Sequence, residues 1–204
     1  MWHFDVLVTF LVASVGLTLA PGPDILYVLS QSLSFGWQKG FAVALGLVSG
    51  LILHTLGVAL GLGFLIEHYP VVFTLIKFSG AAYLLYLAYT SWVEKKTISQ
   101  ANQSNQPTKK DFMTGFVMNV SNPKVSLFFL GFFPAFRFHD SWPMPLQFTL
   151  LGFIFMLQAL LIFFGVSFFS GRFKSSFFTP KRSFNWNKMQ AVFLMAIAIL
   201  LLLS

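Results

Sequence analysis

The chain alternates long apolar runs with short polar segments, and six of the runs are long enough to cross a bilayer. They lie at about 4–30, 41–66, 71–93, 112–136, 145–169 and 189–203. A helix rises ~1.5 Å per residue, so about 20 apolar residues cover the hydrocarbon core. The pattern therefore predicts an all-α, polytopic membrane protein, with six transmembrane helices forming a single domain over residues 1–204.

Two of the predicted helices, the first and the fourth, are interrupted by proline motifs a hundred residues apart. In both motifs a charged residue directly follows a proline: Pro21-Gly22-Pro23-Asp24 and Asn122-Pro123-Lys124. Proline removes a backbone donor and disfavours the helical conformation of the residue before it. In hydrocarbon, the freed backbone groups survive only where protein or a water-filled cavity covers them. Paired breaks of this kind point to the binding site of a transporter.

The breaks and the number of helices indicate two related halves. Three predicted helices fall in repeat 1, about 1–93, and three in repeat 2, about 112–204, with a polar linker at 94–111. An odd number of helices in each half turns one half upside down relative to the other. Inverted repeats place equivalent sites near the bilayer midplane and give the protein two related conformations, one open to each side.

Composition and the distribution of charge set the compartment and the orientation. Only 9% of the residues are charged, against roughly 25% in soluble domains. Of the 13 basic residues, ten, Lys39 among them, belong to the side that receives the loops after helices 1, 3 and 5, whereas Arg137 alone lies on the other. The positive-inside rule makes the first side cytoplasmic and places both termini outside. The same bias explains the net charge of +7 without a nucleic-acid partner.

Several kinds of chemistry have no support in the sequence. The chain has no cysteine, and its four histidines are scattered without metal-ligand spacing. It has no phosphate-binding loop of the ATP-driven pumps. An enzyme would need a nucleophile, paired acids or a metal cluster within the helices. We therefore expect no cofactor, no metal and no enzymatic activity.

Asp24 is the only carboxylate inside the predicted apolar segments. Burying a charge there costs at least ~2.5–3.5 kcal/mol, which favours a functional role in holding a proton, a cation or a substrate ammonium. The alternative is a helix cap at the inner membrane face, because an acid is favourable in the first turn of a helix.

Lys124 lies about 13 residues beyond the cytoplasmic start of helix 4, or ~20 Å deep, too far for its ammonium to reach a surface easily. We expect it to meet a substrate carboxylate or to neutralise Asp24. The alternative is a purely structural ion pair. Asn119 and Asn122 flank it, and their amides can satisfy backbone groups freed by Pro123.

Four further features belong to helices 2 and 3. Lys77 lies about a third of the way into helix 3 and can also snorkel to the surface, whereas Tyr83 supplies a polar tip beside small residues. His54 in helix 2 is interpreted as a packing residue in preference to a proton relay. Helix 2 also carries a stripe of small residues that allows a close helix contact and permits a homodimer, namely Gly46, Gly50, Gly57 and Gly61.

Several motifs in order resemble the LysE/RhtB family of amino-acid exporters. The matching segments are Pro21–Asp24 with Leu29–Leu33, Gly36, Gly40 and Gly46; Lys77–Leu87; Phe112–Gly115 with Asn119; Asn122–Lys124; and Phe132–Phe136. The resemblance implies a secondary transporter of the bacterial inner membrane that exports an amino acid or a related zwitterion, driven by the proton or ion gradient. In such a site Asp24 would meet the ammonium or exchange a proton, and Lys124 would meet the carboxylate. The alternatives are a cation transporter or passive channel of the same fold and, last, an intramembrane enzyme.

Overall fold

The structure is a computed structural model that describes residues 2–20, 22–62, 68–93 and 107–172, with seven single positions between 188 and 202. Most of the linker at 94–111 and most of the predicted sixth helix at 189–203 lie outside the described residues. In the described part, regular structure is helical apart from one isolated bridge between Trp2 and His139. The prediction of an all-helical chain is therefore confirmed for this part.

Both proline motifs break a helix where the sequence predicts it. The first predicted helix is divided into α1 (Phe4–Leu19) and α2 (Pro23–Phe35), which meet at an angle of 55°. The fourth is divided into α6 (Lys109–Val120) and α7 (Pro123–Leu127), bent by 48°. Beyond α7 the chain continues through the π turn η2 (Phe128–Phe132) and the 3-10 turn η3 (Phe133–Phe136).

The other described helices follow the remaining apolar runs. α3 (Trp37–Gly57) continues into the π turn η1 (Val58–Leu62), and the rest are α5 (Pro70–Val93) and α8 (Met144–Arg172). Among the described residues, two helices are long and apolar enough to cross a membrane by themselves, and four if each bent pair is one span. The molecule is thus a helical membrane protein.

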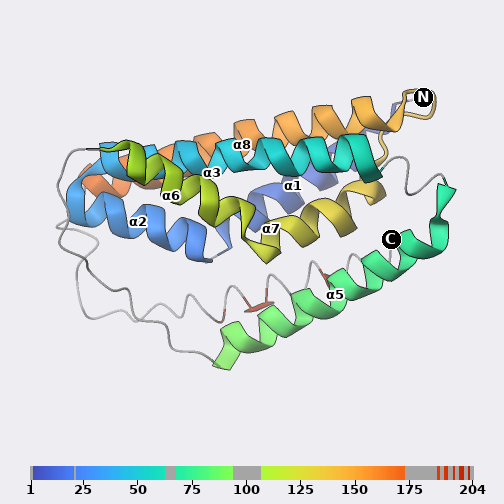
Figure 1. Cartoon of the computed structure of the whole chain (residues 1–204), viewed down its shortest axis with the longest axis horizontal. Coiled ribbons are helices and arrows are strands. Elements are labelled where there is room, and N and C mark those ends of the chain that lie inside the picture. The colour runs from blue at the N-terminus through green and yellow to red at the C-terminus, as the bar shows by residue number, and fades with distance from the viewer. Residues whose placement is uncertain are drawn as a thin grey trace.

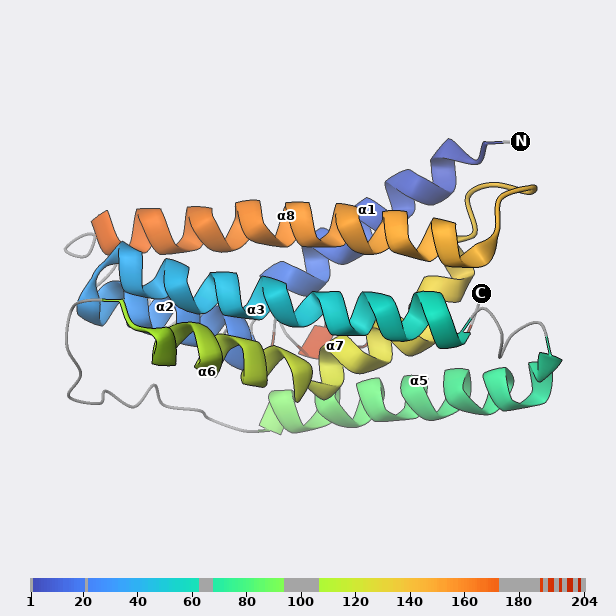
Figure 2. The ribbon, with the colours of Figure 1, turned by 45° about the horizontal axis from the view of Figure 1, so that its top comes forward.

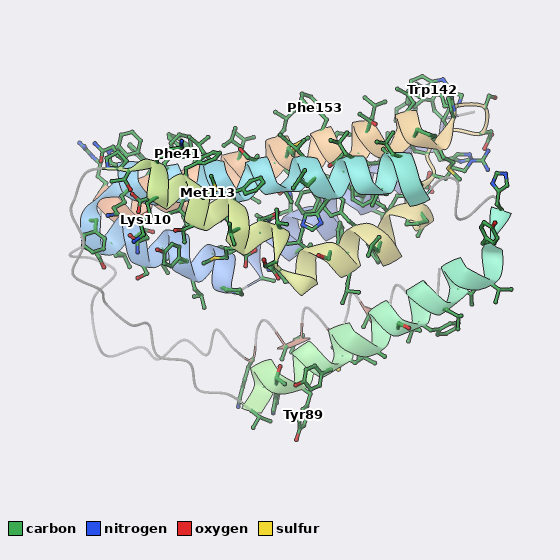
Figure 3. All side chains as sticks on the ribbon, in the orientation of Figure 1. Phe41, Tyr89, Lys110, Met113, Trp142 and Phe153 are labelled. Atoms are coloured by element: carbon green, nitrogen blue, oxygen red, sulfur yellow. The ribbon has the colours of Figure 1, made fainter. Side chains whose placement is uncertain are left out.

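The described helices run lengthwise, with both breaks near the middle of the bundle (Figures 1 and 2). α8 lies along α3, whereas α2 and α6 occupy one end of the bundle and α1 and α7 the other. α5 lies to one side, where it contacts α7 and η2. Apolar side chains on the outside, such as Tyr89 of α5 and Phe153 of α8, point away from the bundle (Figure 3) and provide the surface that faces lipid.

The crossing of α3 and α6 brings two backbones together. A Cβ on Gly46 would overlap the carbonyl oxygen of Phe112, and a Cβ on Gly115 of α6 would overlap the carbonyl oxygen of Val43. The predicted small-residue face is therefore confirmed at Gly46, and at Gly50, which packs on α6. It is wrong for Gly57 and Gly61, since a Cβ at either position would meet nothing within 4 Å among the described residues.

Lys39 is not a loop residue, contrary to the sequence prediction. The turn between α2 and α3 is the single residue Gly36, whose φ of 99° favours glycine. Lys39 therefore falls in the first turn of α3, where it is 2% exposed. Its ammonium lies 3.7 Å from Asp111, and the other oxygen of that carboxylate accepts hydrogen bonds of 2.7 Å from the backbone N–H and the hydroxyl of Thr108.

The Lys39–Asp111 pair yields a stability prediction. Asp111→Asn should destabilise the protein by about 3–5 kcal/mol, because it leaves a buried ammonium without its carboxylate. Replacing both partners together, by Lys39→Met and Asp111→Leu, should recover part of that loss. Thermal unfolding in detergent measures both effects. A double variant less stable than Asp111→Asn would contradict the account.

The end of the bundle where α1 and α8 begin is closed by the segment 137–143. Gln147 of α8 is fully buried, and its amide accepts from the N–H groups of Phe138 and His139 and donates to the carbonyls of His139 and Trp142. A hydrogen bond of 2.9 Å from His3 lowers the pKa of Asp140 to about 2. These contacts attach the start of α1 to the loop before α8.

Candidate transport site

The two helix breaks meet inside the bundle and bring opposite charges together. The Lys124 ammonium lies 3.4 Å from Asp24 Oδ2 and 3.5 Å from Oδ1. The two residues are only 2% and 3% exposed. The structure therefore places the acid and the base that the sequence singles out in one buried pair.

Each of the two charged residues lies in the first turn of a helix that begins at a proline. Gly22 is extended, with φ −139° and ψ 179°, and Pro23 then starts α2 with Asp24 in its first turn. α7 starts in the same way at Pro123, where Asn122 Oδ1 accepts a 3.0 Å hydrogen bond from the Lys124 N–H. The partial positive charge of a helix N-terminus favours Asp24 and disfavours Lys124, so the ammonium needs compensation from elsewhere.

That compensation comes from the end of α1 as well as from Asp24. The Lys124 ammonium donates to the carbonyl of Leu17 at 3.2 Å and to that of Ala20 at 3.4 Å. The C-terminal end of a helix carries partial negative charge. Lys124 is thus held by one carboxylate and one helix end, both supplied by the first half of the chain.

The position of Asp24 along the bent helix pair bears on whether it is a functional carboxylate or a helix cap at the inner membrane face. α1 has 16 residues and α2 has 13, so Asp24 lies about midway along the bent pair. An acid at the inner membrane face would be at the far end of α2, near Gly36. Asp24 therefore occupies a first-turn position near the middle of the bundle, which favours the functional interpretation over the interface cap.

A small cavity adjoins the ion pair. It has a volume of about 10 Å³, room for about one water molecule. Its lining combines Asp24, Lys124, Asn119 and Thr18 with apolar side chains of α1, α3, α7 and α8, namely Leu17, Leu51, Val125, Phe155, Ala159 and Phe163. The described residues therefore leave little free space beside the pair.

Several buried polar atoms around the pair have no hydrogen-bond partner in the described part of the chain. They include Asn119 Oδ1, Asn122 Nδ2 and Gln158 Oε1. Gln158 of α8 donates a 2.9 Å hydrogen bond to the hydroxyl of Thr18, which lines the cavity. His54 Nε2 lies 3.3 Å from the carbonyl oxygen of Asn119. Polar groups of α3, α6 and α8 thus lie near the pair, behind the largely apolar lining of the cavity.

Sequence reasoning missed Thr18 and Gln158. The available signal was weak, since Gln158 is the one amide in the middle of an otherwise apolar run at 145–169. Lys77 and Tyr83 lie on α5, but their side chains are outside the described part, as are Pro21 and the ring of Pro123. Their roles at the site stay predictions.

Gly22 offers a way to disturb the pair without altering either charge. A Cβ at this position would lie 2.7 Å from Asp24 Oδ1 and 3.0 Å from Lys124 Nζ. Gly22→Ala should displace the two flexible side chains and slow transport roughly tenfold, with the amount of folded protein retained, because one tenfold step is only ~1.4 kcal/mol. Gly165→Ala, at a position with nothing within 4 Å of a Cβ, is the matched control. Equal flux in the two variants would contradict the prediction.

An all-helical membrane protein with a buried charge pair where two broken helices meet has the design of a secondary transporter. The chain belongs to the LysE type translocator family, whose family model matches residues 15–204. The family resemblance read from the sequence motifs is thereby confirmed.

The chain is similar to several bacterial proteins over most of its length. It is 29% identical over 195 residues to an uncharacterized membrane protein of Vibrio cholerae, covering 94% of each chain. It is 27% identical over 205 residues to a homoserine/homoserine lactone efflux protein of Salmonella typhi, covering 98% of this chain and 95% of the relative. The membrane protein YrhP of Bacillus subtilis is 34% identical over 140 residues, covering 64% and 67%. No solved structure matches the chain.

Proposed function

We propose that this translocator exports an amino acid, or a closely related zwitterionic metabolite, across the bacterial inner membrane in exchange for protons. The observation that carries the proposal is the buried pair of Asp24 and Lys124, one fixed negative and one fixed positive charge 3.4 Å apart. An amino acid presents the complementary pair of charges. The Salmonella relatives that are named homoserine/homoserine lactone efflux proteins support the same class of cargo.

The residues have distinct roles in this proposal. Asp24 meets the substrate ammonium or exchanges a proton with it. Lys124 and the N-terminal end of α2 meet the carboxylate, since a helix N-terminus attracts anions. Asn119 and Asn122 offer amide groups beside the pair, and Lys77 and Tyr83 are retained as candidate lining residues from α5. No metal or cofactor enters the cycle.

The proposed architecture is six transmembrane helices in two inverted repeats, about 1–93 and 112–204, joined by a cytoplasmic linker at 94–111. The matched bends of 55° and 48° support it. The start of α6 and the end of α8 share one end of the bundle, and both carry basic residues, which supports a cytoplasmic assignment for that end (Figure 1). Both termini then face the periplasm, and transport alternates between two conformations.

The proton gradient is sufficient for the proposed work. One charge moving inward across the membrane releases ~2.3 kcal/mol per 100 mV. That free energy supports roughly fifty-fold accumulation of a neutral zwitterion outside the cell.

The test is a screen of amino acids for efflux from cells that express the chain, with and without an uncoupler. We expect one or a few amino acids to leave faster than from control cells, and the excess to disappear with the uncoupler. Excess efflux that ignores the uncoupler would identify a passive channel. No excess efflux of any amino acid would overturn the proposal.

A further inference from the structure

The ammonium of Lys124 is surrounded by four oxygen atoms, which we call the oxygen cage. These are the carbonyl oxygens of Leu17 and Ala20, at 3.2 and 3.4 Å, and the two carboxylate oxygens of Asp24, at 3.4 and 3.5 Å. They come from the end of α1, its C-cap residue Ala20 and the first turn of α2. Lys124 comes from α7, a hundred residues away in the chain. The cage is therefore built by one segment and filled by another.

The composition of the first motif explains why the carbonyls are available. In an uninterrupted helix, the carbonyl of Leu17 would accept from the N–H of residue 21, and that residue is proline. Ala20 is the C-cap residue of α1 and has already left the helical conformation, with φ −57° and ψ 123°, so its carbonyl is outside the i+4 hydrogen-bond pattern of that helix. Pro21 and the end of α1 thus leave two carbonyls available, and Asp24 adds a full negative charge beside them.

Such a cage suits a primary ammonium. It offers acceptors and no donors, it is buried, and its net negative charge is matched by one cation. Lys124 gains nothing from its own helix, because it lies in the first turn of α7, where the dipole opposes a cation. The four oxygen atoms of the cage, and not the dipole of α7, therefore stabilise the Lys124 ammonium in this position.

We propose that the oxygen cage is the seat of the substrate ammonium, and that Lys124 fills it as a tethered stand-in when substrate is absent. This inference rests on the proposed export of an amino acid. The adjoining cavity has a volume of about 10 Å³, so a second ammonium fits only after that of Lys124 withdraws. Binding of substrate and release of Lys124 are thus one exchange.

The exchange keeps every charge paired. Asp24 is neutralised by Lys124 before the exchange and by the substrate ammonium after it. The displaced Lys124 ammonium then meets the substrate carboxylate. Asn119 lines the same cavity, and its Oδ1 has no hydrogen-bond partner among the described residues, so this oxygen is an available acceptor for the displaced ammonium. An amino acid acylated on its nitrogen has no cation to replace Lys124, and the site rejects it.

The proposal is tested by binding, independently of transport. Purified Lys124→Ala protein has an empty cage, and methylammonium chloride is the probe. We expect a saturable rise in Tm of about 2–4 °C, absent with potassium chloride or tetramethylammonium chloride. Two controls should show no rise in Tm. In the wild-type protein Lys124 occupies the cage, and in the double variant Asp24→Asn, Lys124→Ala the cage has lost its negative charge.

Lys124→Ser serves as a second variant with a small side chain. Folding of either variant only in the presence of methylammonium would also support the cage. Folded variants without a specific Tm rise, or variants that fail to fold with and without the probe, would overturn the inference. Because no flux is measured, amino-acid efflux by the wild type without a methylammonium effect would reject the cage alone. A methylammonium effect without amino-acid efflux would reject the proposed function alone.

Discussion

Asp24→Asn is expected to abolish proton-driven efflux, with a loss of at least about a hundredfold in rate. The substitution keeps the shape of the side chain and removes the charge that holds the Lys124 ammonium. A buried charge that loses its partner is destabilised by about 3–5 kcal/mol, and each 1.4 kcal/mol is a factor of ten. The variant also lacks the group that takes up a proton. Efflux of a preloaded amino acid from cells or vesicles measures the effect.

The control for this variant is Asp5→Asn. Asp5 lies in the first turn of α1, as Asp24 does in α2, but it is exposed. The Asp5→Asn variant should keep an efflux rate within about twofold of wild type, since surface substitutions rarely change the free energy of unfolding by more than ±0.5 kcal/mol. The amount of each variant in the membrane is measured by immunoblot, and efflux rates are compared per amount of protein, so that any loss of stability is separated from loss of transport. Full driven efflux by Asp24→Asn would remove the carboxylate from the mechanism.

Gly46→Leu is expected to destabilise the fold strongly. The Cβ of any side chain at this position would overlap the carbonyl oxygen of Phe112 and lie 2.8 Å from the backbone nitrogen of Phe116. Backbone atoms cannot move away by changing rotamer, so α6 itself would have to shift. Overpacking of this kind costs ~1–3 kcal/mol or more, which lowers Tm by about 6–12 °C at the upper end. Thermal unfolding in detergent, with the yield of monodisperse protein, provides the measurement.

Gly57→Ala provides the control in the same helix. A Cβ at Gly57 meets nothing within 4 Å among the described residues, and alanine favours helix over glycine by up to ~1 kcal/mol. This variant should be as stable as wild type or more stable. If Gly46→Leu and Gly57→Ala unfold at the same temperature, the crossing of α3 and α6 does not have the backbone contact described here.

The backbone of the fold was predictable because its signals are local. Proline at positions 21, 23 and 123 disrupts a helix whatever surrounds it, and long apolar runs require helices in a bilayer. The charges at 24 and 124 were too deep to remain unpaired, so their meeting could be expected. Only the structure shows that the two carbonyls of α1 complete the surroundings of Lys124.

The errors concern features that depend on distant partners. Lys39 was interpreted as a loop residue because it lies between the apolar runs at about 4–30 and 41–66, but its burial depends on Asp111 of α6. Hydrophobic periodicity placed Gly46, Gly50, Gly57 and Gly61 on one face, yet it could not tell how far the neighbouring helix extends along that face. Thr18 and Gln158 were missed because each alone is an ordinary polar residue, and only their 2.9 Å hydrogen bond makes them part of the site.

The interlocked glycines of α3 and α6 also limit how the protein can move. These two helices come from opposite halves of the chain, and sliding one past the other would drive the carbonyl of Phe112 into the backbone at Gly46. We therefore expect α3 and α6 to move together as one rigid pair of helices. In the proposed architecture of two repeats, we therefore expect the molecule to bend within each repeat and not along the border between them, with α1, α2 and α7 changing position relative to this pair of helices.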